Sequence, residues 1–430
     1  MKPLKTFFFL LIILLVIILF NNHKVIIGFF QNERVYTHEI TIIAADTVHV
    51  EGELSEVDID SVKVEGNSFM FLERDSSLFS FFGKLNFAFD SLVRIIYFGD
   101  SQIEGDLITY TLRQVFQQKF GGSGIGYMPA EMYFNTTEQM AVVTNDFDKI
   151  MIESGVENDK NCYGLYGRYF EPNKQVSNIR VNNRSNNHIY SRFRLAFSGG
   201  SYCEMNADNN ELFAQNIKSV SVSVLNIDIS QTPSRLNLKF SENDEFRIYG
   251  MLFDSETGVL VDHVPHRGSL NLMLNRYDGS CIEAMTDILQ PSLVVLHYGM
   301  NVIAGRRESY DSYRIALERD IRIIQSQIPS ASVLVIGASD MAYRDGGEMK
   351  SYENIPAIIE AQRDAAKNSN AAFWDMRAAM GGENSIIDWV ERGHARTDFA
   401  HINAEGAKII GGLLATDLLN AYEFYLETNE

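Results

Sequence analysis

The sequence predicts an α/β fold in which helices cover both faces of a parallel sheet, with a β-rich unit inserted into it. Three observations predict this architecture. Short apolar runs alternate with helical periodicity in two separate parts of the chain, which is typical of a parallel sheet covered on both faces. The region between these parts alternates apolar and polar residues, as half-buried strands do. An apolar segment precedes everything else.

The N-terminal segment, residues 1–30, predicts a membrane anchor. Lys2 and Lys5 precede an apolar run over residues 6–20, and a second apolar stretch follows a short polar break. The first run is short for a span of ~20 residues, but the second extends it, and no small-residue cleavage site follows. We therefore expect a retained signal anchor rather than a removed signal peptide. Lysines before the run place the remaining chain outside the cytoplasm, in the periplasm or cell envelope, and the anchor in the inner membrane.

The α/β domain is predicted to be discontinuous. An apolar run over residues 92–98 leads into Gly-Asp-Ser-Gln at 99–102 and then into helical spacing, which is the order strand, tight turn, helix. The same order returns late in the chain, with strand-like runs at 292–297, 332–336 and 371–375 and helical periodicity at 310–328, 355–367 and 404–426. We assign residues 91–130 and 266–430 to this domain.

The inserted unit is predicted over residues 131–265. Alternating runs such as 219–229 and 235–240 are separated by turns rich in Asn and Ser, with almost no helical period. This pattern favours a β-sandwich of the jelly-roll kind. Residues 31–90 are expected to form a stalk or lead-in that packs on the α/β domain.

Charge and cysteine content exclude several classes of protein. The net charge of -19 argues against binding of nucleic acid or of an anionic lipid surface, because both need clustered Lys and Arg. Cys162, Cys203 and Cys281 form no CxxC pair, so neither a zinc cluster nor a disulfide framework is indicated. A Cys162–Cys203 bridge and two buried free thiols remain alternatives. We expect no metal and no organic cofactor.

Ser101 is a candidate nucleophile because of its place in the chain. Gly99-Asp100-Ser101 lies where an apolar strand passes into a helix, at the edge of the sheet where ligands of open α/β folds bind. The amides and dipole at a helix N-terminus stabilise a developing oxyanion. The alternative is an ordinary turn in which Ser101 caps the helix.

Asp398 and His401 offer the base that such a serine needs. A serine hydroxyl is a poor nucleophile until a base takes its proton, and that base needs a partner that fixes its tautomer. A carboxylate three residues before an imidazole supplies both functions in one loop. The alternative is that Asp398 or Asn403 caps the last helix and that His401 is a surface histidine.

Asn301 and Gly279 are candidate oxyanion donors. Asn301 follows the strand-like run that ends at His297, so its amide is expected at the same sheet edge as Ser101. Gly279 opens another apparent helix, and its N–H can point the same way. The alternative for each is a loop residue selected by turn geometry. His297, within a strand-like run, is interpreted as a core residue.

Together these segments resemble the SGNH (GDSL-type) hydrolase family. The family's four blocks match, in the family's order, GDSQ at 99–102, Gly279, GMN at 299–301 and DFAH at 398–401. The resemblance implies a flavodoxin-like three-layer α/β/α domain. It also implies Ser101 as nucleophile, His401 as base, Asp398 as its orienting partner, and Gly279 and Asn301 as oxyanion donors beside the Ser101 N–H. Two departures are Val302 in place of a common aspartate and Ser-Cys after Gly279.

The subgroup that the chain resembles is the periplasmic peptidoglycan O-acetylesterases. These proteins carry a carbohydrate-binding-like domain between the first two blocks, and here GDSQIEGDLIT and GGSGIGYMP (121–129) precede a long β-rich insert. The resemblance implies an acylated envelope glycan, most simply peptidoglycan, as substrate and partner. Two alternatives stay open: an O-acyltransferase that uses the same serine, and a glycan-binding surface protein without catalysis.

Overall fold

The computed structural model describes residues 76–131, 133–135, 140–152, 162–183, 189–272 and 274–429. The anchor expected over residues 1–30 and the first part of the lead-in lie outside these ranges. Within the described part of the chain, no helix is both long enough and apolar enough to cross a membrane.

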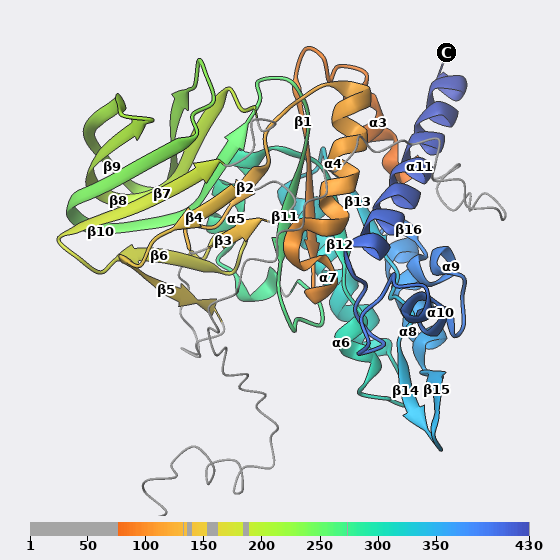
Figure 1. Cartoon of the computed structure of the whole chain (residues 1–430). Helices are drawn as coiled ribbons and strands as arrows, with labels where there is room; N and C mark the ends of the chain where they lie inside the picture. Colours follow the sequence, from red (N-terminus) through yellow and green to blue (C-terminus); the bar gives the residue numbers. More distant parts are fainter. Residues whose placement is uncertain are drawn as a thin grey trace, which may run out of the picture. The chain divides into compact units, whose positions relative to one another are not determined.

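The centre of the α/β domain is a five-stranded parallel sheet (Figure 1). Its strands, in chain order, are β1 (Leu92–Gly99), β11 (Gly258–Pro265), β12 (Pro291–His297), β13 (Ser332–Ile336) and β16 (Ala372–Trp374). Their spatial order is β11-β1-β12-β13-β16, which is the order 2-1-3-4-5 of flavodoxin-like sheets. The predicted α/β class with a parallel sheet is confirmed.

Helices cover both faces of this sheet because each strand is apolar on both sides. In β1, Val93, Ile95 and Tyr97 enter one apolar core, and Ile96 and Phe98 enter the other. The first core is closed by α3 (Phe79–Leu85), α4 (Leu107–Phe120) and α11 (Ala404–Asn429), and the second by α5 (Gly279–Leu289), α7 (Asp311–Gln327) and α8 (Ile355–Asn368). Shorter elements of this domain are η3 (Ser76–Leu78), η4 (Ser101–Asp106), η6 (Leu274–Arg276), α6 (Met300–Ile303), β14 (Ala342–Asp345), β15 (Glu348–Ser351), α9 (Met376–Met380) and α10 (Ser385–Glu391).

The last part of the lead-in belongs to the α/β domain. Helix α3 buries Phe81 and Phe82 completely, and their rings lie 6.4 Å from Phe116 and 6.0 Å from Tyr422, respectively. Residues 76–90 therefore close the first core beside α4 and α11.

The inserted unit is one continuous nine-stranded sheet that curls around its own core (Figure 1). Its strands are β2 (Gly126–Met128), β3 (Tyr133–Asn135), β4 (Met140–Val143), β5 (Phe147–Met151), β6 (Arg168–Pro172), β7 (Val176–Asn183), β8 (Arg192–Ala207), β9 (Asn210–Asp228) and β10 (Arg235–Asp254). Register shifts between Ser241 and Gly250 bend β10 against β8, as bulges do. After this bend, the ring centres of Phe147 in β5 and Phe240 in β10 lie 5.9 Å apart. The two halves of the curled sheet therefore face one another.

The boundaries of the insert differ from those predicted. Strand β11, which we assigned to the insert, pairs in parallel with β1 along its whole length and belongs to the central sheet. At the other end, β2 pairs with β10, so the chain enters the inserted sheet before residue 130. All residues of β11 except the last are buried, which is typical of a strand in a parallel sheet that is covered on both faces.

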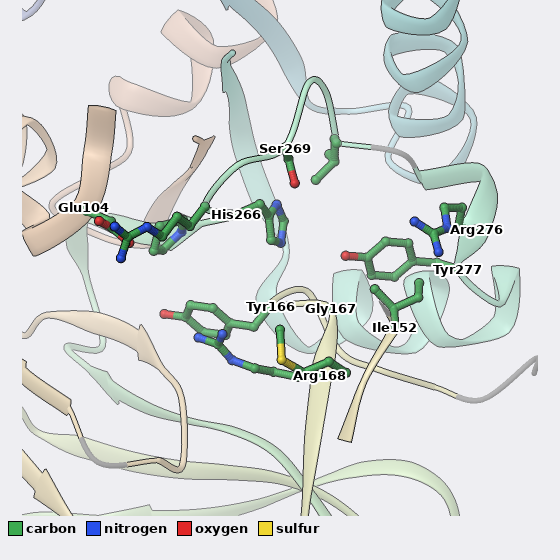
Figure 2. A pocket seen from close by; sticks show the side chains of 13 residues that line it. Glu104, Ile152, Tyr166, Gly167, Arg168, His266, Ser269, Arg276 and Tyr277 are labelled. Carbon is green, nitrogen blue, oxygen red and sulfur yellow. The ribbon is translucent and has the colours of Figure 1, made fainter. Parts of the chain in front are cut away.

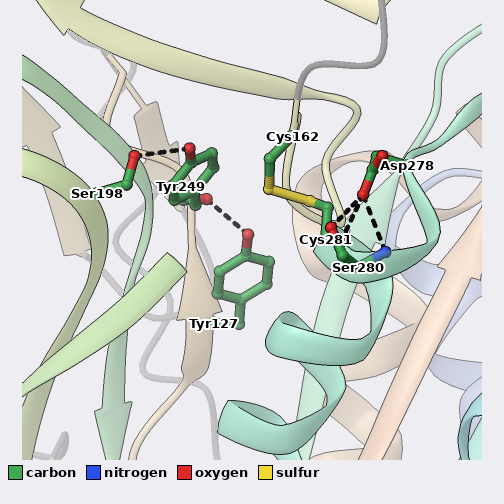
Figure 3. The surroundings of a disulfide bond; sticks show 7 residues. All are labelled: Tyr127, Cys162, Ser198, Tyr249, Asp278, Ser280 and Cys281. Carbon is green, nitrogen blue, oxygen red and sulfur yellow. Dashed lines mark hydrogen bonds between the residues drawn. A yellow bond between two sulfur atoms is a disulfide. The ribbon is translucent and has the colours of Figure 1, made fainter. Parts of the chain in front are cut away.

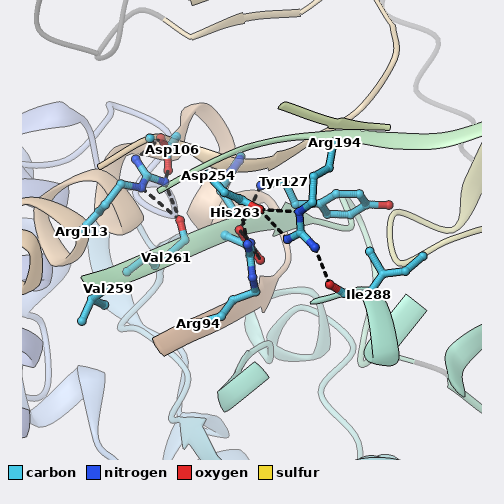
Figure 4. A network of polar contacts seen from close by, with 12 residues as sticks. Arg94, Asp106, Arg113, Tyr127, Arg194, Asp254, Val259, Val261, His263 and Ile288 are labelled. Atoms are coloured by element: carbon cyan, nitrogen blue, oxygen red, sulfur yellow. Dashed lines mark hydrogen bonds and ion pairs between the residues drawn. The ribbon is translucent and has the colours of Figure 1, made fainter. Parts of the chain in front are cut away.

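A buried ion network joins the two domains (Figure 4). Arg94 of β1 is fully buried, and its Nη1 lies 2.7 Å from Asp262 Oδ1 while its Nη2 lies 2.7 Å from Asp254 Oδ1. Arg194 of the inserted strand β8 donates from Nε to Asp254 Oδ2 at 2.7 Å and from Nη1 to the carbonyl of Ile288 at 2.7 Å. Each charge therefore has an opposite partner inside the protein.

A disulfide provides a second link, and it is not the pairing considered above (Figure 3). Cys162 bonds to Cys281 in the first turn of α5, which ties the insert to the α/β domain. Cys203 stays a free thiol, because its side chain points into the insert's own core and is completely buried there.

We predict that Arg94→Met destabilises the protein by about 3–5 kcal/mol, because the substitution leaves a buried carboxylate without its cation. Urea unfolding of the full chain followed by circular dichroism measures this loss. Arg192→Met is the matched control, since Arg192 forms only exposed contacts at 3.5 Å, and pairs of that kind contribute ~0–1 kcal/mol. Equal losses in the two variants would contradict the role given to Arg94.

Candidate active site

The serine turn sits where β1 ends between its two neighbours. The Asp100 N–H donates to the carbonyl of His297 at 3.1 Å, and the His266 N–H donates to the carbonyl of Gly99 at 2.7 Å. A Cβ on Gly99 would lie 2.9 Å from the His297 oxygen and 2.9 Å from Ile103 Cγ2, so only glycine fits there. Ser101, the first residue of η4, is thus held at the carboxyl edge of the sheet.

Ser101, His401 and Asp398 lie in a hydrogen-bonded row. The Ser101 Oγ is 2.9 Å from His401 Nε2, and His401 Nδ1 is 2.8 Å from Asp398 Oδ2. Because a carboxylate only accepts, Nδ1 carries the proton and Nε2 is left to accept from the serine hydroxyl. The structure therefore brings together three of the predicted site residues from positions 300 residues apart.

The Asp398 carboxylate is fixed in its charged form. Its Oδ1 accepts from the backbone N–H groups of Ala400 and His401, each at 3.0 Å. Burial acts to raise the pKa of Asp398, but the hydrogen bonds from His401 and Ala400 outweigh it and lower that pKa below its ordinary value. Asp398 can thus hold the histidine tautomer and stabilise an imidazolium.

Gln102 holds the histidine loop against the serine turn, and our sequence reasoning did not single it out. Its Nε2 donates to the carbonyl of Ala400 at 3.0 Å and to Ser339 Oγ at 2.8 Å, while its Oε1 accepts from the N–H of Ile402 at 3.4 Å. Gln102 thus binds the backbone on both sides of His401. Its place directly after the serine was the only sequence signal for this role.

A second set of contacts fixes η4 to the neighbouring strand β11 (Figure 4). His263 of β11 donates from Nε2 to the carbonyl of Ile103 at 2.7 Å, and burial lowers the pKa of His263, which favours its neutral form. Asp106, in the left-handed conformation, pairs with Arg113 at 2.9 Å, and Arg113 Nη2 donates to the carbonyl of Val261 at 2.7 Å. The turn is therefore bonded to the strand beside it.

Asn301 lies at the same sheet edge as Ser101. It follows β12 in the short helix α6, and its Nδ2 donates to the carbonyl of Ser269 at 3.1 Å. His297, at the end of β12, is a core residue as expected: its Nδ1 lies 3.0 Å from the Tyr97 hydroxyl, and burial lowers its pKa to about 3.

The role of Gly279 as an oxyanion donor stays a prediction. It is exposed at the first residue of α5, two residues before Cys281 of the disulfide. Gly268, with a φ of +77°, lies three residues after the end of β11 and precedes Ser269, the partner of Asn301. Gly268 was not predicted as a site residue because β11, the strand before it, was assigned to the insert.

A cavity of about 150 Å³ lies beside η4, the short helix that begins at Ser101 (Figure 2). One wall comes from the α/β domain and includes Glu104 of η4 and Ser269. The opposite wall comes from the insert and includes Tyr166 and Arg168. The described residues contain no group of three or more His, Cys, Asp or Glu arranged for a metal ion.

Searches with family models and with curated sequences return no match. Among solved structures, a peptidoglycan O-acetylesterase aligns with a TM-score of 0.63 at 19% identity, over 80% of this chain and 96% of that one. The chain has the fold of the SGNH-type esterases. A family two carbohydrate esterase from Cellvibrio japonicus aligns with a TM-score of 0.28 at 9% identity, over 70% of this chain and 95% of that one. An acetyl esterase aligns with a TM-score of 0.28 at 20% identity, over 38% of this chain and 72% of that one.

In this SGNH-type fold the residue before the serine is a buried acid with a raised pKa. Burial raises the pKa of Asp100 to about 7, although the N–H groups of Gln102, Met300 and Gly299 act to lower it. Because the pKa of Asp100 is higher in the folded state than in the unfolded state, its contribution to the free energy of unfolding is complete below about pH 4. This contribution is lost as the pH rises toward 7.

We predict that Asp100→Asn removes the loss of stability that Asp100 causes between pH 4 and pH 7, because an asparagine cannot ionise. Relative to wild type, the free energy of unfolding of the variant should rise by up to about 4 kcal/mol between pH 4 and pH 7, at about 1.4 kcal/mol per pKa unit. Urea titrations at a series of pH values test this, and a constant difference across the range would contradict it.

Proposed function

We propose that the protein is a serine esterase that removes O-linked acetyl groups from a cell-envelope polysaccharide, with peptidoglycan as the first candidate. The row Asp398, His401 and Ser101 carries the proposal, because its contacts of 2.8 and 2.9 Å are those of a nucleophile, a base and an orienting group. The likeness of the fold to a peptidoglycan O-acetylesterase supports this choice of substrate.

In the proposed acylation step, His401 Nε2 takes the Ser101 proton as Oγ attacks the acetyl carbonyl carbon. The carbonyl electron pair moves to the oxygen, which becomes the oxyanion of a tetrahedral intermediate. When this intermediate collapses, the C–O bond to the sugar breaks and the imidazolium of His401 returns the proton to the leaving sugar oxygen. Asp398 keeps the Nδ1 proton in place throughout.

In the proposed deacylation step, water repeats the attack. His401 takes a proton from the water as it adds to the acetyl-serine ester. The second tetrahedral intermediate collapses to acetate, and Ser101 recovers its proton from His401. No cofactor is required by either step.

The proposed oxyanion site consists of the Ser101 N–H and the side chain of Asn301, with a backbone donor from the loop after β11. The Asn301 amide carries two hydrogens, of which one is donated to Ser269, so the other is available to the oxyanion. We favour the backbone at Gly268 over Gly279 as the further donor, because the Gly268 loop is bonded to Asn301 through Ser269.

We also propose an extracytoplasmic location with a retained N-terminal anchor. The Cys162–Cys281 disulfide supports it, since structural disulfides persist in oxidising compartments and are rare in the cytosol of most organisms. The lysines before the N-terminal apolar run support it independently.

We predict that Ser101→Ala lowers the hydrolysis of p-nitrophenyl acetate by the full chain at least ~10³-fold, since the alanine has no nucleophile. Release of p-nitrophenol measures the rate. Ser312→Ala, at an exposed position of α7, is the matched control and should keep the wild-type rate. Equal rates in the two variants would refute the esterase assignment.

We predict that Asn301→Ala lowers kcat/KM for the same ester by ~10²–10³-fold, because a lost oxyanion donor costs about 2.7–4 kcal/mol. Its Tm should change little, as folding loses only the bond to Ser269, worth about 1 kcal/mol. Asn368→Ala is the control. It removes one side-chain hydrogen bond of 2.9 Å, from Asn368 of α8 to Glu318, and should leave the rate unchanged. A large fall in Tm without a fall in rate would show that Asn301 is structural.

A further inference from the structure

We propose that the cavity between the insert and the serine turn binds a carboxylate carried by the glycan, so that the enzyme prefers acidic acetylated glycans to neutral ones. We call this cavity the insert pocket. The inference rests on the proposed esterase function and extends it to the class of glycan that is recognised.

The charge of the insert pocket is opposite to that of the protein. Among the residues that the structure describes, its walls contain Arg168, Arg267 and Arg276 and one acidic residue, Glu104, in a chain whose net charge is -19. Burial lowers the pKa of His266 to about 4, with a contribution from Arg168, so this histidine adds no charge at neutral pH. A positive pocket on an acidic protein attracts and retains an anion.

Two of these arginines have donors that the described protein does not use fully. Arg276 is exposed and has no hydrogen bond or ion pair in the described part of the chain, and Arg267 reaches Glu104 only at 3.7 Å. A guanidinium presents a planar fork that binds a carboxylate through two parallel hydrogen bonds. These two side chains can therefore turn to an anion without breaking a close ion pair.

The third arginine is built into the wall. Arg168 Nη2 pairs with Glu131 Oε1 at 2.7 Å, and its guanidinium lies 5.3 Å from the centre of the Tyr166 ring. Its Nε is buried and has no acceptor among the residues that the structure describes. Arg168 therefore adds a fixed positive charge to the wall, while Arg267 and Arg276 carry the donors that can turn to a ligand.

The remaining walls suit a sugar ring. Figure 2 shows Tyr166 and Tyr277 on two sides of the pocket, with Ile152 beside Tyr277. Apolar and aromatic walls with a few placed polar groups are typical of small-molecule sites. The pocket thus combines a surface for a ring with a charged group for an acidic substituent.

The pocket is lined by residues that are bonded to the proposed catalytic groups or share a short helix with them. Ser269 lines it and accepts the hydrogen bond of Asn301, and Glu104 lies in the same short helix as Ser101. His266, also a lining residue, donates its backbone N–H to the carbonyl of Gly99. A glycan held in the pocket would therefore lie beside the helix η4 and the loop after β11, which adjoin the proposed catalytic groups.

The wall from the insert is held firmly in place. The Tyr166 hydroxyl lies 2.8 Å from the carbonyl of His263, and His266 Nε2 donates to the carbonyl of Leu165 at 2.9 Å. The Cys162–Cys281 disulfide anchors the same loop. Because these contacts lie within the protein itself, this wall requires little ordering when a ligand binds.

The test compares Arg276→Gln with wild type in the full chain on four esters: p-nitrophenyl acetate, acetylated xylan, O-acetylated peptidoglycan and acetylated polygalacturonate. We expect kcat/KM to fall about 10- to 100-fold on the carboxylate-bearing glycans, mainly through KM, and to stay unchanged on p-nitrophenyl acetate and xylan. Arg235→Gln, an exposed arginine at the start of β10, is the control and should change none of the four.

The two acidic glycans separate the possible sources of the carboxylate. A loss on peptidoglycan alone assigns it to the lactyl or peptide groups, and a loss on polygalacturonate alone assigns it to the sugar. Amidation of the peptidoglycan carboxylates should lower the wild-type rate and abolish the difference between wild type and variant.

Equal losses on xylan and on the acidic glycans, or no loss on any glycan, would overturn the carboxylate proposal while p-nitrophenyl acetate hydrolysis still supports the esterase. Absence of p-nitrophenyl acetate hydrolysis by wild type would instead overturn the proposed function. Binding of unacetylated polygalacturonate and peptidoglycan to Ser101→Ala, with and without Arg276→Gln, then tests the pocket by itself. Binding to neither glycan, or binding unaffected by Arg276→Gln, would overturn the pocket proposal.

Discussion

The close approach of Gly99 to β12 is the constraint on which the site depends. Gly99 has no side chain, so β1 can lie close to the end of β12 and turn there. A Cβ at this position would be 2.9 Å from the His297 carbonyl oxygen, which is too close. The Asp100 N–H then bonds to that carbonyl, and the His266 N–H bonds to the Gly99 carbonyl on the other side. The serine turn is thus fixed to both neighbouring strands, and the loops that follow these strands supply Asn301 and the wall of the insert pocket.

The histidine loop reaches this turn from the far end of the chain, and Gln102 makes the contact rigid. A base must stay within hydrogen-bond reach of the hydroxyl that it deprotonates. His401 meets this requirement because Gln102 bonds to the backbone at Ala400 and Ile402, on either side of it. Since Gln102 adjoins Ser101, a movement of the proposed nucleophile would carry the proposed base with it. The geometry of the row is therefore determined locally, although its members are 300 residues apart.

The sequence predicted the features that are encoded locally and missed those that depend on pairing in space. The parallel sheet, the Ser101 turn and the position of Asn301 follow from apolar runs and the residues directly after them. Strand β11 was misassigned because its sequence lies next to alternating strands, and Gly268 was missed with it. The Cys162–Cys281 bond joins residues 119 positions apart, and no spacing rule selects it over Cys162–Cys203.

The contacts between the domains hold the insert at one position relative to the α/β domain, as the proposed selection of a substrate by the insert requires. Arg94 and Asp254 are buried charges, and such pairs fix one relative arrangement more than they add stability, because each charge without its partner would be costly. The disulfide restrains the same interface from the loop that carries Arg168. If the two domains moved relative to one another, the arginines of the pocket would not keep a fixed position relative to Ser101. Here the units are locked, so the α/β domain can supply the chemistry while the insert supplies a charged wall at a fixed position.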